Sequence, residues 1–97
     1  MAGPTDRSQP PHVQRWQSVL NEHWPTQPQQ FKDRPPGIPV RARVQWERDG
    51  EEYLFGVAIR WDADHVYVQI RDTTGRLAGQ GVWLKPADVY RMGDPTT

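Results

Sequence analysis

Two segments carry arginine or aromatic side chains at even spacing, two or four residues apart. These side chains are the groups in this chain best suited to binding a ligand. Arg41 and Arg43 lie in one segment, and Tyr67 and Arg71 lie in a later one. Since alternate residues of a strand face the same side, we expect all four on the solvent-facing side of neighbouring strands. Basic groups interleaved with an aromatic ring suit a single-stranded nucleic acid, whose bases stack on the ring. The competing interpretation is an ordinary solvated sheet surface, in which the charges of Arg43 and Glu47 offset each other.

Residues for catalysis or metal binding do not form a recognisable set. The chain has no cysteine, and no serine stands in a motif with a histidine and an orienting acid. His12 and His23 are eleven residues apart, too far for one metal ion if both lie on a helix, and His65 falls in a turn. Asp62 and Asp64 are typical of turn residues, with a weak Mg²⁺ site as the alternative. We therefore expect no enzyme activity, no cofactor and no metal.

Length and charge limit the classes of protein to which this chain can belong. Ninety-seven residues allow one domain, and the polar, proline-rich ends indicate that the packed part is smaller than the chain. The formal net charge is zero, which argues against strong non-specific phosphate binding as the main role. No stretch is apolar enough to span a bilayer or to serve as a secretion signal, so we expect a cytoplasmic protein. The preference for arginine over lysine is typical of a G+C-rich, bacterial-type genome.

The stretch from Val40 to Trp61 reads as two strands joined at Asp49-Gly50, a strong signal for a tight hairpin turn. Apolar residues alternate in both halves, and this alternation predicts that they form one buried face. The residues expected on that face are Val40, Ala42, Val44, Trp46, Tyr53, Phe55, Val57, Ile59 and Trp61.

Three further strands are expected after the hairpin. Alternation over His65–Arg71 predicts the third, and Leu77–Leu84, interrupted by Gly79 and Gly81, predicts the fourth. Lys85–Val89 suits a single 3₁₀ turn and Tyr90–Met92 a short last strand. Five short strands with tight turns describe a small closed sheet.

The N-terminal part is expected to differ from the rest. Residues 1–9 read as a disordered tail, and 10–24 as an amphipathic helix whose stripe includes Trp16 and Trp24. This helix would pack either on its own sheet or in the groove of a partner. Residues 25–38 read as a proline-rich connector that stiffens the path to the strands, and 93–97 as a tail.

Residues 39–92 resemble a Tudor-type SH3-like barrel. The positions that carry the resemblance are Ala42, Trp46, Asp49-Gly50, Tyr53, Val57, Val66, Val68, Asp72, Gly75, Val82, Leu84 and Asp88-Val89. The resemblance implies an aromatic cage for a methylated lysine or arginine, with Trp46 and Tyr53 as two of its walls. Ile70, Thr73 and Thr74 stand where the family has its other walls, so the cage is incomplete. The alternative is that Trp46 and Tyr53 end the core stripe and cap the barrel mouth.

Together these observations predict a mainly β protein: a five-stranded SH3-like barrel over residues 39–92, with an N-terminal helix and a proline-rich connector. We expect a non-enzymatic binding module, monomeric by default, that binds another protein through the barrel surface and its helix. The candidate residues are Trp16, Trp24, Arg41, Arg43, Trp46, Tyr53, Tyr67 and Arg71. The alternative is a nucleic-acid-binding domain that uses Arg41, Arg43, Tyr67 and Arg71.

Overall fold

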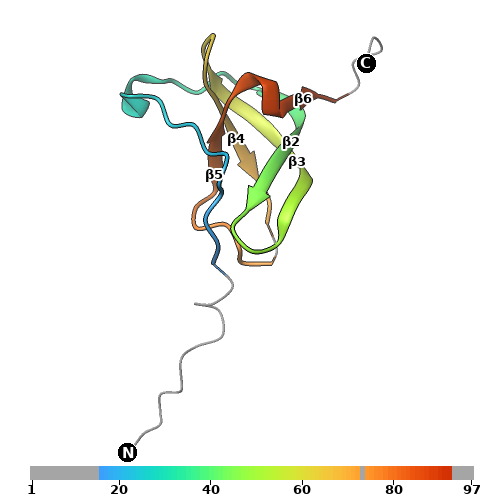
Figure 1. Cartoon of the computed structure of the whole chain (residues 1–97). Helices are drawn as coiled ribbons and strands as arrows, with labels where there is room; N and C mark the ends of the chain where they lie inside the picture. The colour runs from blue at the N-terminus through green and yellow to red at the C-terminus, as the bar shows by residue number, and fades with distance from the viewer. Residues whose placement is uncertain (1–15, 73, 93–97) are drawn as a thin grey trace, which may run out of the picture.

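Alternating side chains and tight turns give five antiparallel strands in the computed structural model, which describes residues 16–72 and 74–92 (Figure 1). The order across the sheet is β5-β4-β3-β2-β6. The mainly β, five-stranded prediction is confirmed. The strands are β2 (Ile38–Trp46), β3 (Gly50–Trp61), β4 (Val66–Ile70), β5 (Gly81–Leu84) and β6 (Val89–Arg91), with 3₁₀ turns η1 (Pro28–Gln30) and η2 (Pro86–Asp88).

The hairpin of β2 and β3 is the longest pairing. Its loop, residues 47–49, includes Asp49 of the predicted turn, and Gly50 is the first residue of β3. Gly50 has a φ of 80°, a left-handed conformation that glycine adopts without steric cost. From Trp46 opposite Gly50, the ladder continues without interruption to Ile38 opposite Ala58. The turn therefore fixes the partner of every residue in β2.

The inward face of β3 is not the one that its apolar alternation predicts. Residues directly opposite each other share a face, so Leu54 lies beside buried Ala42, whereas Phe55 lies beside exposed Arg41. The core positions of β3 are consequently Leu54 and Ala58. The expectation that Tyr53, Phe55 and Val57 form the buried face is wrong. Three residues, 47–49, separate the paired residues Trp46 and Gly50, and this register turns the three side chains outward.

A β-bulge restores the expected side for the last residue of β3. The register shifts between Ala58 and Arg60, which leaves Ile59 as the extra residue. An extra residue moves all later side chains to the opposite face. Trp61 therefore returns to the inner side, where it packs against the core opposite Val66.

The fourth strand is shorter than the sequence indicates, because it begins at Gly81 and not at Leu77. The carboxylate of Asp72 accepts the backbone N–H of Leu77 at 2.8 Å, which holds that segment in a loop. Gly81 is needed for close packing, since a Cβ there would lie 2.5 Å from the carbonyl oxygen of Val68 and 2.7 Å from the Tyr67 ring. Leu77–Gln80 is thus a loop that returns the chain to the sheet beside β4.

The part of the predicted N-terminal helix that the structure describes, residues 16–24, is not helical: it runs without regular structure, with a bridge from Val19 to Trp46 and one turn at Leu20 and Asn21. Its burial alternates, with Gln17 and Val19 buried and Ser18 and Leu20 exposed. Residues 10–15 of the predicted helix, like the predicted tails at 1–9 and 93–97, lie outside the described residues. The helical stripe through Trp16 and Trp24 competes with this period-two pattern, and the extended form prevails because it pairs with open strand edges.

The segment 16–25, which we call the strap, joins two strands that are not neighbours in the sheet. The Leu20 N–H donates to the carbonyl of Gln45 in β2 at 2.7 Å, and the Ser18 carbonyl accepts the N–H of Glu47 at 2.9 Å. Further along, the His23 N–H donates to the carbonyl of Trp83 in β5 at 2.8 Å. In Figure 1 the strap runs in blue and cyan from the β2–β3 turn past β5.

Strap and connector together cover the outer side of β5. Trp83 points away from the core yet is only 2% exposed, because Trp24, Phe31 and Tyr67 surround it. The Phe31 ring meets Trp83 edge-on at 4.9 Å, which attaches the proline-rich segment to the sheet. One half of the outer face is therefore closed by the chain itself.

Asn21 is the polar anchor of the strap. Its Nδ2 donates to the carbonyl of Arg43 at 2.8 Å and to Asp88 Oδ2 at 3.1 Å, and its Oδ1 accepts the N–H of Gln45 at 2.9 Å. We expect Asn21→Ala to lower the free energy of unfolding by about 2 kcal/mol, because it leaves part-buried backbone groups without partners. Urea titration followed by tryptophan fluorescence measures the effect. Ser18→Ala, an exposed strap position, is the control, and equal losses in the two variants would contradict the anchoring role.

Candidate binding surface

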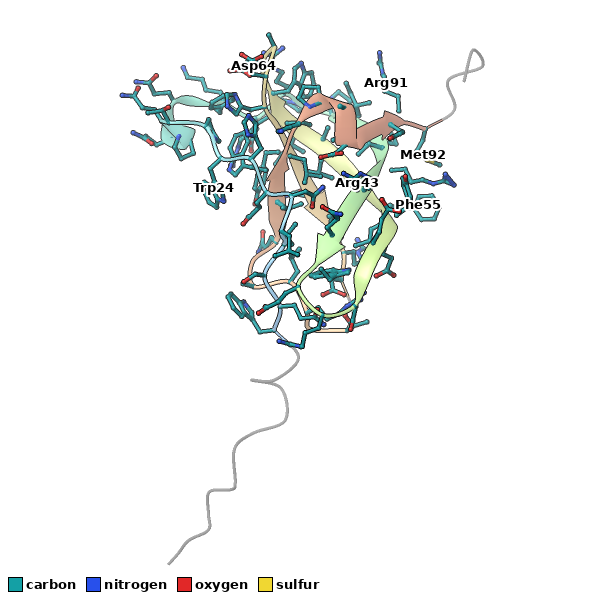
Figure 2. The ribbon with its side chains drawn as sticks, viewed as in Figure 1. Trp24, Arg43, Phe55, Asp64, Arg91 and Met92 are labelled. Carbon is teal, nitrogen blue, oxygen red and sulfur yellow. The ribbon has the colours of Figure 1, made fainter. Side chains whose placement is uncertain are left out.

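The uncovered half of the outer face carries a group of exposed large side chains, which we call the outer platform. It consists of Arg41, Tyr53, Phe55, Tyr90 and Met92. Phe55 is 66% exposed, Tyr53 46%, Met92 45% and Tyr90 43%. Figure 2 shows Phe55 and Met92 projecting from the side of the sheet where β3 and β6 lie.

Strand register arranges part of the platform as a row across the sheet. Tyr90 of β6 is opposite Arg41 of β2, and Arg41 is opposite Phe55 of β3. Gly56 is opposite Ile70, so the next step of the antiparallel register places Arg71 beside Phe55. Neighbouring strands are about 4.8 Å apart, so aromatic and arginine side chains alternate at that spacing.

Within the platform, aromatic rings contact one guanidinium and each other. The Cζ of Arg41 lies 6.0 Å from the ring centroids of both Tyr53 and Phe55. The rings of Tyr53 and Tyr90 meet edge-on, with centroids 5.9 Å apart. Desolvation and the nearby charge of Glu51 raise the pKa of the Tyr53 phenol. The platform thus presents aromatic faces, hydroxyl groups and one guanidinium together.

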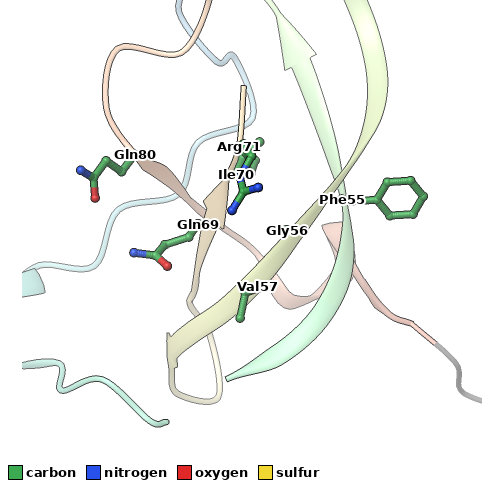
Figure 3. Close-up of a pocket in the computed structure, with 7 residues that line it drawn as sticks. All are labelled: Phe55, Gly56, Val57, Gln69, Ile70, Arg71 and Gln80. Carbon is green, nitrogen blue, oxygen red and sulfur yellow. The ribbon is translucent and has the colours of Figure 1, made fainter. Parts of the chain in front are cut away.

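A groove of about 560 Å³ continues the platform over β3 and β4. Its lining residues are Phe55, Gly56, Val57, Gln69, Ile70, Arg71 and Gln80. In Figure 3 the Arg71 side chain stands between Phe55, which projects from β3, and the amides of Gln69 and Gln80. These three polar side chains can donate hydrogen bonds to an occupant, since guanidinium and amide groups carry N–H donors.

Positive charge on this surface is not neutralised within the described chain. Arg41 and Arg71 have no carboxylate within ion-pair distance among residues 16–72 and 74–92. Glu51 and Asp88, two acids close to this surface, bind Arg43 at 2.7 and 3.0 Å. Those hydrogen bonds, to Glu51 first and then to Asp88, raise the pKa of Arg43. Arg43, a predicted ligand-binding residue, is therefore occupied within the fold.

Trp46 and Tyr53 do not lie together, although the sequence analysis expects them as neighbouring walls. Trp46 is 2% exposed on the inner face, where its Nε1 donates to Glu52 Oε1 at 3.0 Å and Arg76 covers its ring at 4.4 Å. Tyr53 is on the outer face. The two residues face opposite sides because Trp46 is opposite Gly50, three residues before Tyr53.

Tyr67 also lies apart from the platform. Its half-buried ring is 5.0 Å from the ring of Trp83 and 5.0 Å from the guanidinium of Arg60. Among the residues predicted for nucleic acid, Arg41, Arg43 and Arg71 lie on the uncovered half of the outer face, but Arg43, opposite Tyr53, is bound there by Glu51 and Asp88.

Trp16 and Trp24 are exposed, at 49% and 59%, but they occupy an extended segment and not a helical stripe. Both line a hollow of about 270 Å³ between the strap and the loop at Leu77–Gly81. Burial raises the pKa of Glu22 beside them. The strap thus brings the two tryptophans to one site, by a different geometry from the predicted one.

Sequence reasoning missed Phe55, Tyr90 and Met92 as surface residues. The period-two series Tyr53, Phe55, Val57 predicts a core position for Phe55 and Tyr53, although Leu54 between them is also apolar. A two-residue turn at Asp49-Gly50 would pair Phe55 with Val44. The loop in the structure has three residues, 47–49, and pairs Phe55 with Arg41, so the loop length decides that these residues are exposed.

Comparisons with protein-family models, with curated proteins and with solved structures gave no match for this chain. Within the described ranges, no group of three or more histidine, cysteine, aspartate or glutamate residues could hold a metal ion. Across those same residues, no helix has the length and apolar character that a bilayer crossing requires.

Two single substitutions at adjacent residues test which face of β3 is buried. We expect Phe55→Ser to change the free energy of unfolding by less than about 0.5 kcal/mol, because the side chain is exposed. Leu54→Ser should lower it by about 2 kcal/mol, because Leu54 packs against the core. Urea titrations of both variants measure the difference, and a larger loss for Phe55→Ser would show that the alternation predicted the buried face correctly.

The loop that carries Arg71 and Gln80 depends on ionised Asp72. Desolvation raises the pKa of this carboxyl, but hydrogen bonds from Thr74 and the Leu77 N–H outweigh it, so the pKa lies below its usual value. A lowered folded-state pKa contributes stability above the unfolded pKa of about 3.9 and loses it as pH falls through the folded pKa. We expect Asp72→Asn to have a lower free energy of unfolding than the wild-type protein at pH 7. The difference between the two proteins should become smaller below pH 3. Urea titrations at several pH values measure this, and a pH-independent gap would contradict the assignment.

Proposed function

We propose that this protein is a non-enzymatic binding module that holds a protein partner on the outer platform and its adjoining groove. One observation carries the proposal: Tyr53, Phe55, Tyr90 and Met92 are all strongly exposed and adjacent on one sheet face. The other half of that face is covered by the strap and connector. Selective exposure of one half supports a role for it in recognition.

The composition of the platform supports a protein partner. Large apolar side chains grouped on a surface are typical of interaction sites. Tyrosine, phenylalanine, methionine and arginine are enriched in interface cores, and tyrosine and arginine often contribute most of the binding energy. Because these residues are on paired strands, binding would order few additional backbone dihedrals.

The charges favour an acidic, extended segment of the partner. Arg41 and Arg71 offer guanidinium groups without carboxylate partners in the described chain, and arginine binds carboxylates with two parallel hydrogen bonds. Gln69 and Gln80 supply amides that suit a peptide backbone. Phe55 and Val57 supply apolar contact between these polar groups.

The strand order supports assigning residues 39–92 to an SH3-like barrel of the Tudor type. The first strand, β2, is flanked by the second strand and the last one, with a 3₁₀ turn just before the last. The strap bridges β2 and β5, which closes the sheet further. The binding role proposed here is on the outer face, since Trp46 is buried and unavailable as the wall of a methyl-lysine or methyl-arginine cage. We infer a cytoplasmic monomer.

A single-stranded nucleic acid is the second candidate ligand. The row Tyr90, Arg41, Phe55 and Arg71 alternates stacking and cationic groups, the arrangement that single-strand platforms use. The zero net charge of the chain weighs against this candidate.

A peptide selection tests the protein-binding proposal. A random peptide display library is selected on the intact protein, and the binding of the enriched peptides is measured by fluorescence polarisation. We expect sequences that combine Asp or Glu with an apolar residue. The double variant Tyr53→Ser/Phe55→Ser should weaken their binding more than about tenfold, since loss of one or two central contacts exceeds 1.4 kcal/mol.

Trp24→Ser, an equally exposed aromatic outside the platform, is the matched control and should leave the affinity unchanged. Enriched peptides that bind the double variant as tightly as the wild type would refute the platform as the site. A parallel titration uses twelve-nucleotide oligo-dT at two salt concentrations. Salt-sensitive amide shifts at Arg41, Phe55 and Arg71, without any peptide binding, would favour nucleic acid instead.

A further inference from the structure

A second hollow lies on the inner side of the sheet, at the end away from the β2–β3 turn. Its volume is about 250 Å³. The side chains that shape it are Ile38, Val40, Ala58, Trp61, Val66 and Val89. In Figure 1 the β3–β4 turn and η2, which flank this hollow, lie together at the end of the molecule opposite the β2–β3 turn. We call this hollow the end recess.

The end recess opens directly onto the hydrophobic core. Val40, Ala58 and Val66, all core residues, form part of its wall. The opposite end of the core is closed, because Trp46 fills it and the guanidinium of Arg76 covers the Trp46 ring at 4.4 Å. Arg76 is held there by Asp49 at 3.0 Å and Glu52 at 2.9 Å. At the recess end the large side chain is Trp61, which forms one wall and leaves the hollow open beside the small Ala58.

Two charged residues, Asp62 and Arg91, stand at the rim of the end recess, and Asp62 is held as a carboxylate by hydrogen bonds within its own turn. The Asp62 carboxylate accepts the N–H groups of Asp64 and His65, both at 2.8 Å, and lies 3.0 Å from His65 Nδ1. The hydrogen bond from Asp64, with those from His65, lowers the pKa of Asp62 despite its partial desolvation. Arg91 has no carboxylate within ion-pair distance in the described part of the chain. Figure 2 places Arg91 at this end of the molecule.

We propose that the end recess binds a small carboxylate with an aromatic or branched apolar body. The body lies against Val40, Ala58 and Val66, and the carboxylate pairs with the Arg91 guanidinium. Cavities of about 150 Å³ with apolar linings accept a benzene ring, so this recess has room for a ring and a short side chain. An arginine without a carboxylate partner among residues 16–72 and 74–92 favours an anion, because guanidinium and carboxylate form two parallel charged hydrogen bonds.

The end recess is independent of the outer platform. Val89 and Arg91 point to the inner side of β6, whereas Tyr90 between them points to the platform. The two surfaces are therefore on opposite faces of one short strand, and binding at one does not require the other.

Three probes with the same ring test whether binding requires a negative charge. They are 3-phenylpropionate, 3-phenylpropan-1-ol and 3-phenylpropylamine. Each is titrated into the full-length protein at pH 7, with methyl NMR signals of Val40, Val66, Val89 and Ala58 as the readout. We expect the carboxylate to shift these signals with millimolar affinity, the alcohol to bind about tenfold more weakly, and the amine to bind most weakly. Shifts confined to platform residues, or no shift at the recess, would overturn the site.

Arg91→Gln tests the anchor without disturbing the core, because Arg91 is exposed. It should weaken the carboxylate about tenfold and leave the alcohol unchanged. Lys32→Gln removes an equal charge elsewhere and is the matched control. Equal weakening by both variants, or an amine that binds as tightly as the carboxylate, would refute the role of Arg91. Val89→Trp should abolish binding of all three probes by filling the recess.

Discussion

The register of the β2–β3 hairpin is the constraint on which the rest of the structure depends. Gly50 allows the turn, and the turn pairs Ala42 with Leu54 and Arg41 with Phe55. Because opposite residues share a face, this pairing places small and branched side chains inside and aromatic rings outside. The aromatic alternation of β3 would have favoured the reverse arrangement, which would also have buried Arg41. The charged face of β2 therefore decides which face of β3 is exposed.

The strap supplies hydrogen-bond partners for the part of β2 that β6 leaves unpaired. The second half of β2 extends beyond the short strand β6, and its backbone groups need partners. Ser18 and Leu20 supply hydrogen bonds from the main chain, and the buried Gln17 side chain accepts the N–H groups of Arg48 and Asp49 at the turn. These partners explain why a segment with a helical apolar stripe is extended, since unpaired backbone groups of β2 would be costly. The same segment continues to β5 and helps to bury Trp83.

Coverage is distributed unevenly over the two faces of the sheet, and both proposed ligand sites follow from this. On the outer face, strap and connector cover β5 but leave Phe55, Tyr90 and Arg41 exposed. On the inner face, Trp46 and Arg76 close one end of the core while the end beside Val89 and Arg91 is hollow. A chain with so small a core has few large residues to fill both ends, so the uncovered places are where a ligand gains most from burial.

The sequence by itself determined the class of fold, the five strands, the hairpin turn and the 3₁₀ turn before the last strand. These depend on local patterns: period-two alternation, Asp49-Gly50 and Pro86. The tertiary structure alone decided which side of β3 is buried, that residues 16–24 are extended, and that Arg43 and Trp46 are occupied within the fold. The physical reason is that these outcomes depend on partners far apart in the chain. Phe55 is exposed because of Arg41, the strap is extended because of Gln45 and Trp83, and Arg43 is neutralised by Asp88.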